Sequence, residues 1–257
     1  MGALRERRAR PRSLALVYCG GVSSGRRRRD FLLRAGTLGA ALACGPAAVA
    51  APPAKTRPRR PRSDDEEVTP AEDLMREHGV LNRILLVYEE AVRRLEAGVE
   101  LPPDAVGGAA GIVRRFVEDY HEKLEEEHLF PRFVKAGTLA DLVEVLKAQH
   151  EAGRALTGDI IGLAAPAAGD ARSRQTLVSR LRAFVRMYRP HEAREDTVLF
   201  PALHRLIPER EYRALGDRFE RREHELFGER GFEGVVDEVA AIEKSLGIYD
   251  LAQFTSA

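Results

Sequence analysis

The feature that most constrains this 257-residue chain is a small pattern of histidine and glutamate that occurs twice, about seventy residues apart. Each copy has a lone histidine, then a second histidine that is followed four positions later by a glutamate. The six residues are His78, His121, Glu125, His150, His191 and Glu195. Both copies continue into Leu-Phe-Pro. Residues four apart lie on one face of a helix, so each copy can present an imidazole and a carboxylate in the same direction.

This residue chemistry predicts a metal site between helices. Imidazole and carboxylate together suit iron, manganese or zinc, and the duplication favours two ions. Two octahedral ions have about twelve coordination positions, of which four imidazoles and two bridging carboxylates fill about eight. Open positions distinguish a reactive metal site from a structural one. We therefore expect a centre that can bind a small molecule.

The apolar periodicity and the loop signals predict an all-α protein. Four long helices are expected over residues 69–97, 104–134, 139–164 and 171–206. Thr69-Pro70-Ala71-Glu72 combines the signals of a helix start, whereas Pro190 is expected to kink or divide the fourth helix. Short loops between long helices favour an antiparallel up-down-up-down bundle. Two extra C-terminal helices, over 208–228 and 232–246, could cover one end of the bundle or support dimerisation.

Charge is distributed unevenly. Residues 1–50 hold ten arginines and two acids, so the rest has 31 basic and 38 acidic side chains. An acidic body is a poor partner for nucleic acid, whose binding rests on Lys and Arg. The basic segment has the architecture of an export signal. Its Arg28-Arg29-Asp30-Phe31-Leu32 resembles the twin-arginine type, and its apolar run is too short to span a membrane.

The chain is therefore divided into four predicted parts. They are a signal peptide (1–51), a disordered Pro/Arg-rich linker (52–68), the helical bundle (69–206) and a C-terminal helical extension (207–257). Cleavage after Ala50 would place the mature protein in the periplasm or outside the cell, with the twin-arginine export machinery as a partner. It would also remove both cysteines, Cys19 and Cys44, and with them any thiolate ligand.

Four segments of the bundle match, in order, a known family. They are Glu77-His78-Gly79-Val80-Leu81-Asn82-Arg83, His121…Glu125-Glu126…Leu129-Phe130-Pro131, Gln149-His150-Glu151-Ala152-Gly153-Arg154 and His191…Glu195-Asp196…Leu199-Phe200-Pro201. In these segments the chain resembles the hemerythrin-like (HHE cation-binding) domain, over about residues 70–206. The resemblance implies a four-helix bundle with two non-haem iron ions joined by an oxide or hydroxide bridge. It also implies that the four histidines are terminal ligands and the two glutamates are bridges.

Two positions depart from the oxygen-carrying hemerythrins that the chain resembles. Arg154 stands one turn after His150, where those proteins have a further histidine, and Glu195 stands where they have an aspartate. We therefore expect a di-iron protein that binds or senses oxygen, another diatomic or peroxide, or that handles iron. The alternative is a di-iron oxidoreductase acting on peroxide or nitric oxide. A ferritin-like carboxylate bundle needs Glu-x-x-His on two helices, but that motif occurs here only as Glu125-x-x-His128.

The remaining histidines and the tyrosines beside the ligands receive weaker assignments. His128 is expected near the site or in no role, His204 on the surface, and His224 either on the surface or as a fifth imidazole. Tyr120 and Tyr188 are core residues or redox-active neighbours. In the run Glu125-Glu126-Glu127, only Glu125 is expected to point inward, and the Leu-Phe-Pro segments are expected to cap the site.

Overall fold

The computed structural model describes residues 68–255, and within that range it contains helices and no strand. The first and third helices of the bundle are uninterrupted: α1 (Pro70–Ala97) and α5 (Ala140–Ala164). The second is a continuous helical rod whose hydrogen-bonding pattern changes along its length. Its segments are α2 (Ala105–Ile112), η1 (Val113–His121), α3 (Glu122–Leu124), η2 (Glu125–Leu129) and α4 (Phe130–Ala136).

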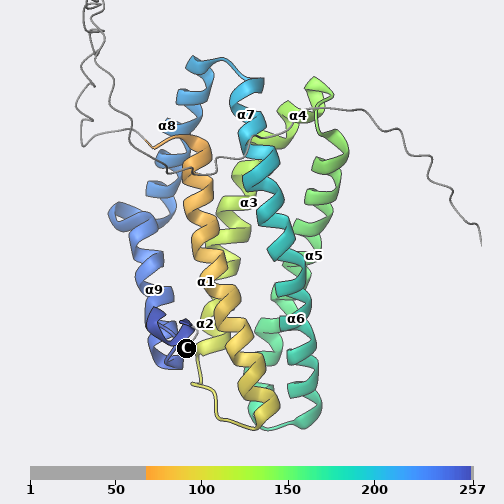
Figure 1. The fold of residues 1–257 in the computed structure, drawn as a ribbon, viewed down its shortest axis with the longest axis vertical. Helices are drawn as coiled ribbons and strands as arrows, with labels where there is room; N and C mark the ends of the chain where they lie inside the picture. The colour runs from red at the N-terminus through yellow and green to blue at the C-terminus, as the bar shows by residue number, and fades with distance from the viewer. Residues whose placement is uncertain (1–67, 256–257) are drawn as a thin grey trace, which may run out of the picture. The chain divides into compact units, whose positions relative to one another are not determined.

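The fourth helix consists of α6 (Ala171–Arg194), η4 (Glu195–Leu199) and α7 (Phe200–Leu206). Short connections, one of which contains the 3-10 turn η3 (Pro166–Ala168), reverse the chain between successive helices. The four helices therefore stand side by side in an antiparallel bundle, with α1 packed on α6 and α2 on α5 (Figure 1). The all-α bundle predicted from the sequence is confirmed.

Local signals explain where the first helix begins and ends. The Thr69 side chain accepts a hydrogen bond from the Glu72 backbone N–H, and Glu72 in turn accepts one from the Thr69 backbone N–H, which forms a capping box. Gly98 ends α1 with a φ of 68°, a left-handed conformation that glycine adopts readily. Pro190 does not divide the fourth helix, because α6 continues through it. Pro190 and Arg186, whose carbonyl the proline leaves without an N–H donor, both lie on the exposed face, where water can hydrate that carbonyl.

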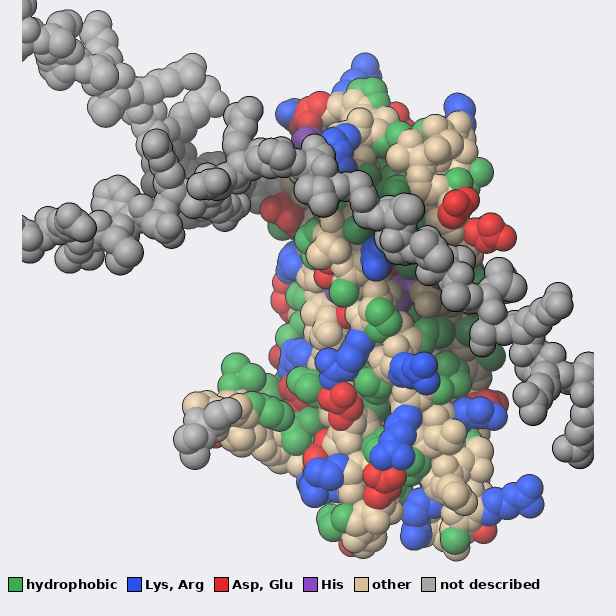
Figure 2. Space-filling view, turned by 45° about the vertical axis from the view of Figure 1, so that its right-hand side comes forward, with side chains coloured by type: hydrophobic (Ala, Val, Ile, Leu, Met, Phe, Trp, Pro, Cys, Tyr) green, Lys and Arg blue, Asp and Glu red, His purple; other side chains and the backbone are tan. Residues whose placement is uncertain are grey.

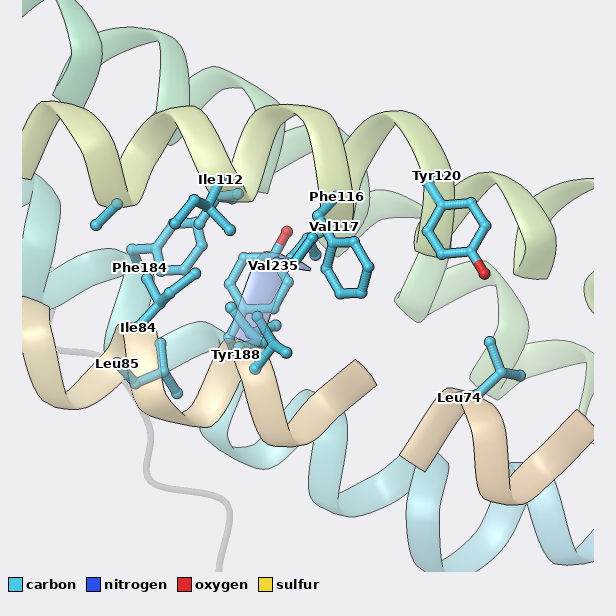
Figure 3. Packing of buried hydrophobic residues seen from close by; sticks show 14 of the residues in the cluster. Leu74, Ile84, Leu85, Ile112, Phe116, Val117, Tyr120, Phe184, Tyr188 and Val235 are labelled. Carbon is cyan, nitrogen blue, oxygen red and sulfur yellow. The ribbon is translucent and has the colours of Figure 1, made fainter. Parts of the chain in front are cut away.

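The C-terminal helices lie along the side of the bundle and do not cover one end of it. α8 (Glu209–Phe227) and α9 (Gly231–Leu246) are joined by the turn η5 (Gly228–Arg230), and the short turn η6 (Leu251–Phe254) follows. Both helices pack on α1, and α9 also packs on α2 (Figure 1). Figure 3 shows Val235 of α9 among core residues of the bundle, and the ring of Phe232, also in α9, lies 6.4 Å from that of Phe116 between centroids. The extension therefore shares the bundle's hydrophobic core.

The outer surface carries charges of both signs. Figure 2 shows Lys and Arg side chains interspersed with Asp and Glu, while only small areas of histidine are visible on this face. None of the described helices is long and apolar enough to cross a membrane. The predicted signal peptide, both cysteines and nearly all of the predicted linker lie outside the described residues.

Candidate metal centre

The six predicted ligands converge in the interior of the bundle, one histidine from each helix. His78 comes from α1, His121 from the end of η1, His150 from α5 and His191 from α6. Glu125 and Glu195 each begin a π-helical turn. All six residues are buried, and none is more than 4% exposed. Of the four groups of three among the described residues that could hold a metal ion, two consist entirely of these ligands: His78, His121 and Glu125, and His150, His191 and Glu195.

The histidines form two close pairs, one for each copy of the repeat. The Nε2 atoms of His78 and His121 are 3.1 Å apart, and the two ring centroids are 4.8 Å apart. The ring centroids of His150 and His191 are 5.0 Å apart with a similar tilt. Two nitrogens that bind one ion at about 2.1 Å and at right angles to each other lie about 3 Å apart. The first pair therefore already has the spacing that a shared ion requires.

Both glutamates reach from one histidine pair to the other. Oε1 of Glu125 is 3.9 Å from Nε2 of His121, and its Oε2 is 3.4 Å from Nε2 of His150. Oε2 of Glu195 is 3.5 Å from Nε2 of His78 and 3.1 Å from Nε2 of His191. Each carboxylate thus faces one histidine of each copy. This placement is what a bridge between two ions needs.

Five side-chain atoms of the six predicted ligands lack hydrogen-bond partners. Among the described residues, both carboxylate oxygens of Glu125 and of Glu195, together with Nε2 of His150, are buried without one. Buried polar groups of this kind are costly, and in native proteins they are normally satisfied. Bound cations would satisfy all five atoms at once. The residues present therefore fit a two-ion centre of nitrogen and oxygen ligands.

A second layer of side chains orients the imidazoles through their Nδ1 atoms. Oε2 of Glu77 is 2.5 Å from Nδ1 of His121, and Oε1 of Gln149 is 2.9 Å from Nδ1 of His191. These two residues directly precede His78 and His150, so they occupy equivalent positions in the repeat. A partner on the far nitrogen fixes the tautomer and the orientation of a ligating histidine.

The other two histidines are held by the opposite copy. Oδ1 of Asp196 is 2.8 Å from Nδ1 of His78, and Oε1 of Glu126 is 3.1 Å from Nδ1 of His150. Asp196 and Glu126 directly follow the two bridging glutamates. The prediction that Glu126 lies on an exposed face is therefore wrong, because the π turn beginning at Glu125 directs its side chain towards His150.

Further polar contacts surround this layer, and they differ between the copies. Nη2 of Arg154 is 2.6 Å from Glu126 and 2.8 Å from Glu122, and the Tyr188 hydroxyl donates to Glu122 at 2.7 Å. At the equivalent positions of the other copy, the amide of Asn82 donates to Glu192 at 2.5 Å. Arg154 therefore neutralises carboxylates beside the centre and does not face the metal space itself.

The Leu-Phe-Pro segments place an aromatic ring over one histidine of the opposite copy. Phe130 stacks on His150 with centroids 5.5 Å apart, and Phe200 stacks on His78 at 5.4 Å, both with an interplanar angle of 27°. The prolines that follow also explain the π turns. A proline clashes with the carbonyl four residues earlier, and the preceding turn widens so that the N–H of Phe130 bonds to the carbonyl of Glu125. Phe200 and Glu195 repeat this bond.

Burial sets the protonation of the site. It lowers the pKa of both His121 and His191 to about 4, so both rings are neutral at pH 7, which is the form that binds metal. Burial also raises the pKa of Glu195 to about 7. For His150, burial opposes the charge, but the neighbouring carboxylates of Glu125 and Glu126 raise its pKa to about 10. Ion binding must therefore displace protons from this cluster.

The other histidines lie away from the centre. His128 is half-buried and stacks on Phe219, His204 is exposed beside Glu209, and His224 is exposed on α8. None of these three belongs to a group that could hold a metal among the described residues. His224 therefore does not supply a fifth imidazole in this structure. Tyr120 and Tyr188 are both buried.

The second layer could have been found from the sequence, although the ligand motif alone does not contain it. Glu77 and Gln149 each directly precede the lone histidine of their copy. Glu122 and Glu192 directly follow its second histidine, and Glu126 and Asp196 directly follow its glutamate. Polar residues repeated at matching offsets next to ligands are the signal. Their side-chain directions follow only from the packed helices.

Fold and site together define a helical-bundle protein with a buried nitrogen and oxygen metal centre. The family model of the hemerythrin HHE cation binding domain matches residues 69–203, and the chain belongs to this family. An uncharacterized protein of Mycobacterium bovis is 52% identical over 204 residues, which cover 79% of this chain and 80% of that protein. Two uncharacterized proteins of Mycobacterium tuberculosis match with the same identity and coverage. No solved structure matches the chain significantly.

Proposed function

We propose that this protein binds two non-haem iron ions and uses them to bind or sense oxygen or a related small molecule, or to handle iron. The ligands are the six residues of the repeat: His78, His121, Glu125, His150, His191 and Glu195. The observation that carries the proposal is the pair of buried carboxylates, each facing a histidine of both copies with its oxygens unpartnered. When bound, iron would supply a redox-active centre with positions left for an exogenous ligand.

The chain's own residues support a small ligand. All six proposed ligands are at most 4% exposed, and Phe130 and Phe200 cover two of the imidazoles. A small diatomic or a peroxide is the size of molecule that such a buried centre can admit. The second-layer carboxylates and the Gln149 amide hold the rings in place, so ligands to the ions are pre-oriented.

Reaction with oxygen and with peroxide separates binding from catalysis. Purified protein is reconstituted with ferrous iron without oxygen, and is then mixed in a stopped-flow spectrometer with oxygen or with hydrogen peroxide. We expect about two irons per chain and an absorption change on adding oxygen that reverses when oxygen is removed. Iron-loaded protein that shows no spectral response to oxygen, to peroxide or to nitric oxide would contradict a ligand-binding role.

The second candidate is an oxidoreductase acting on peroxide or nitric oxide. The observation that favours it is the network of Arg154, Glu122 and Tyr188 beside His150, which places a cation, a carboxyl group and a phenol hydroxyl next to one ligand of the centre. Repeated turnover of peroxide by iron-loaded protein would establish this function. The rate of peroxide turnover should fall in Arg154→Gln. It should be unchanged in Arg213→Gln, a control that alters an exposed arginine.

We also propose that the protein is exported through the twin-arginine route. The support is the Arg28-Arg29-Asp30-Phe31-Leu32 motif and the Ala48-Val49-Ala50 site that follows it. This route would allow iron to be loaded before export. Cell fractionation should find the protein outside the cytoplasm, and Arg28→Lys with Arg29→Lys should retain it inside. Unchanged export of that double variant would contradict the proposal.

A further inference from the structure

A second group of carboxylates lies between α1 and the C-terminal helices, outside the centre described above. There, a cavity of about 260 Å³ opens between α1, α8 and the start of α9. Its lining is strongly acidic, with five carboxylates and one cationic side chain: Asp73, Asp217, Glu220, Glu223, Glu233 and Arg76. Such a cavity favours cations over anions.

Three carboxylates of this region approach one another closely. One oxygen from each of Asp73, Glu77 and Glu223 lies within 4.8 Å of the other two. Glu77 is only 2% exposed, and its Oε1 atom is buried without a hydrogen-bond partner. Its other oxygen, Oε2, is the one that holds Nδ1 of His121. Glu77 therefore stands between this group and the centre, with one oxygen committed and one free.

Glu223 is held in place by the backbone of the next helix. Its Oε1 atom accepts a hydrogen bond of 2.8 Å from the backbone N–H of Phe232. The approach depends on Gly231, where a Cβ atom would lie 1.9 Å from that same oxygen. Gly231 also has a φ of 33°, in the range that favours glycine. The chain thus fixes one oxygen of Glu223 and leaves the other for a ligand.

The cation that approaches these three carboxylates does so from the surface and offsets them only in part. Arg76 approaches Asp73 at 3.6 Å from an exposed position, and its guanidinium lies over the Phe232 ring. Burial, together with Glu77 and Glu223, raises the pKa of Asp73 to about 7. Like charges at this spacing are unfavourable unless protons or a cation bind between them.

We propose that Asp73, Glu77 and Glu223 form a third cation site, which takes a hard divalent ion such as Mn²⁺ or Fe²⁺ through oxygen ligands alone. Carboxylate oxygens are the ligands that such ions prefer. The site differs from the centre in having no imidazole, and it is reached from the acidic cavity. Because Glu77 is shared with the layer behind His121, an ion here would lie one side chain away from the buried centre.

Manganese titration of the iron-loaded protein tests the proposal. Free Mn²⁺ is counted by electron paramagnetic resonance, and iron is counted separately, so the two kinds of site are distinguished. We expect one additional Mn²⁺ per chain in the wild type. Glu223→Gln and Asp73→Asn should each weaken that binding about tenfold or more while leaving the iron content unchanged. The control Glu229→Gln removes the same charge from an exposed position between α8 and α9 and should bind Mn²⁺ like the wild type.

The same titration on Glu125→Ala/Glu195→Ala separates this proposal from the di-iron one. That variant lacks both carboxylate bridges but keeps the third site, so it should still bind one Mn²⁺ that Glu223→Gln removes. Terbium offers a local readout, since the chain has no tryptophan and Tyr120 is buried near this group, where burial and then Glu77, Asp73 and Glu223 raise its pKa. Tyr120→Phe should reduce sensitised Tb³⁺ emission without changing Mn²⁺ binding. Absence of additional Mn²⁺ in the wild type, or Mn²⁺ binding as tight as the wild type in both Glu223→Gln and Asp73→Asn, would overturn the proposal.

Discussion

The two halves of the centre have matching geometry but different charge behind their histidines. In the first half, Nδ1 of His121 faces the carboxylate of Glu77, whereas the equivalent His191 faces the neutral amide of Gln149. Around His78 and His150, the carboxyl groups of the first half again have the less positively charged neighbours.

Glu192 accepts a hydrogen bond from the neutral amide of Asn82. Glu122 and Glu126 instead form ion pairs with the guanidinium of Arg154. The first half, built on His78 and His121, therefore has more carboxyl groups without a cationic partner. Burial raises the pKa of Glu77 to about 8 and that of Glu192 to about 9, so these groups become negatively charged as cations bind and displace their protons. Carboxylate partners raise the basicity of a ligating imidazole, so the proposed ions should be held unequally, more tightly in the first half.

The largest effect is expected when both halves are broken together. Glu125→Ala combined with Glu195→Ala removes each carboxylate that faces both histidine pairs. Iron content measured by mass spectrometry should fall from about two per chain to nearly none. Glu127→Ala, an exposed neighbour in the same acidic run, is the matched control and should keep both ions. Retention of two irons by the double variant would show that the bridges are not ligands.

The predicted difference in ion affinity between the two halves can be reduced by exchanging the residues behind His121 and His191. Glu77→Gln gives His121 the kind of partner that His191 has, and it should weaken the tighter ferrous-binding step about 10-fold to 100-fold. Gln149→Glu should strengthen the weaker step. Calorimetric titration without oxygen measures both steps.

Asp73→Asn serves as the control for that exchange, because it alters the acidic cavity but leaves the pairing of Glu77 with His121 intact. The comparison between the halves would be wrong if the wild type showed two equal steps. It would also fail if Glu77→Gln and Gln149→Glu changed neither step.

A smaller, structural effect is expected at a glycine that only the second half requires. A Cβ atom at Gly153 would lie 2.0 Å from the Tyr188 hydroxyl oxygen, whereas one at Gly79, beside His78, meets nothing within 4 Å. Gly153→Ala should therefore lower the free energy of unfolding by about 1–3 kcal/mol. Gly79→Ala should raise it by about 0.5–1 kcal/mol, since alanine favours the helix.

Urea denaturation of the metal-free protein gives both free energies without a contribution from bound ions. Partial recovery of stability in Gly153→Ala/Tyr188→Phe would attribute the loss to the tyrosine contact. Equal stability of the two alanine variants would contradict the packing described here.

The bundle and the convergence of the six residues follow from the sequence for simple physical reasons. Long apolar periodicity with short loops leaves few ways to pack four helices, and residues four apart must share a face. The roles of Glu126 and Arg154 do not follow, because both depend on where the π turn at Glu125 directs the chain. Pro131 signals that turn only once its clash with the preceding carbonyl is considered.

The position of the C-terminal helices also required the structure. Their apolar faces show that they pack against something, but several surfaces of a bundle can receive such a face. Val235 of α9 belongs to the core and Phe232 of the same helix packs near Phe116, so the helices complete the side of the bundle (Figure 3). The acidic cavity exists because of this placement, which brings Glu223 to Asp73 and Glu77 across a long separation in sequence.

The central claim is that two ions lie between two matched histidine pairs. Diffraction at the iron absorption edge from crystals of the iron-loaded protein tests it most directly. We predict two anomalous peaks per chain, one against Nε2 of His78 and His121 and the other against Nε2 of His150 and His191. Glu125 and Glu195 should each contact both. A single peak, or iron located away from these histidines, would contradict the account.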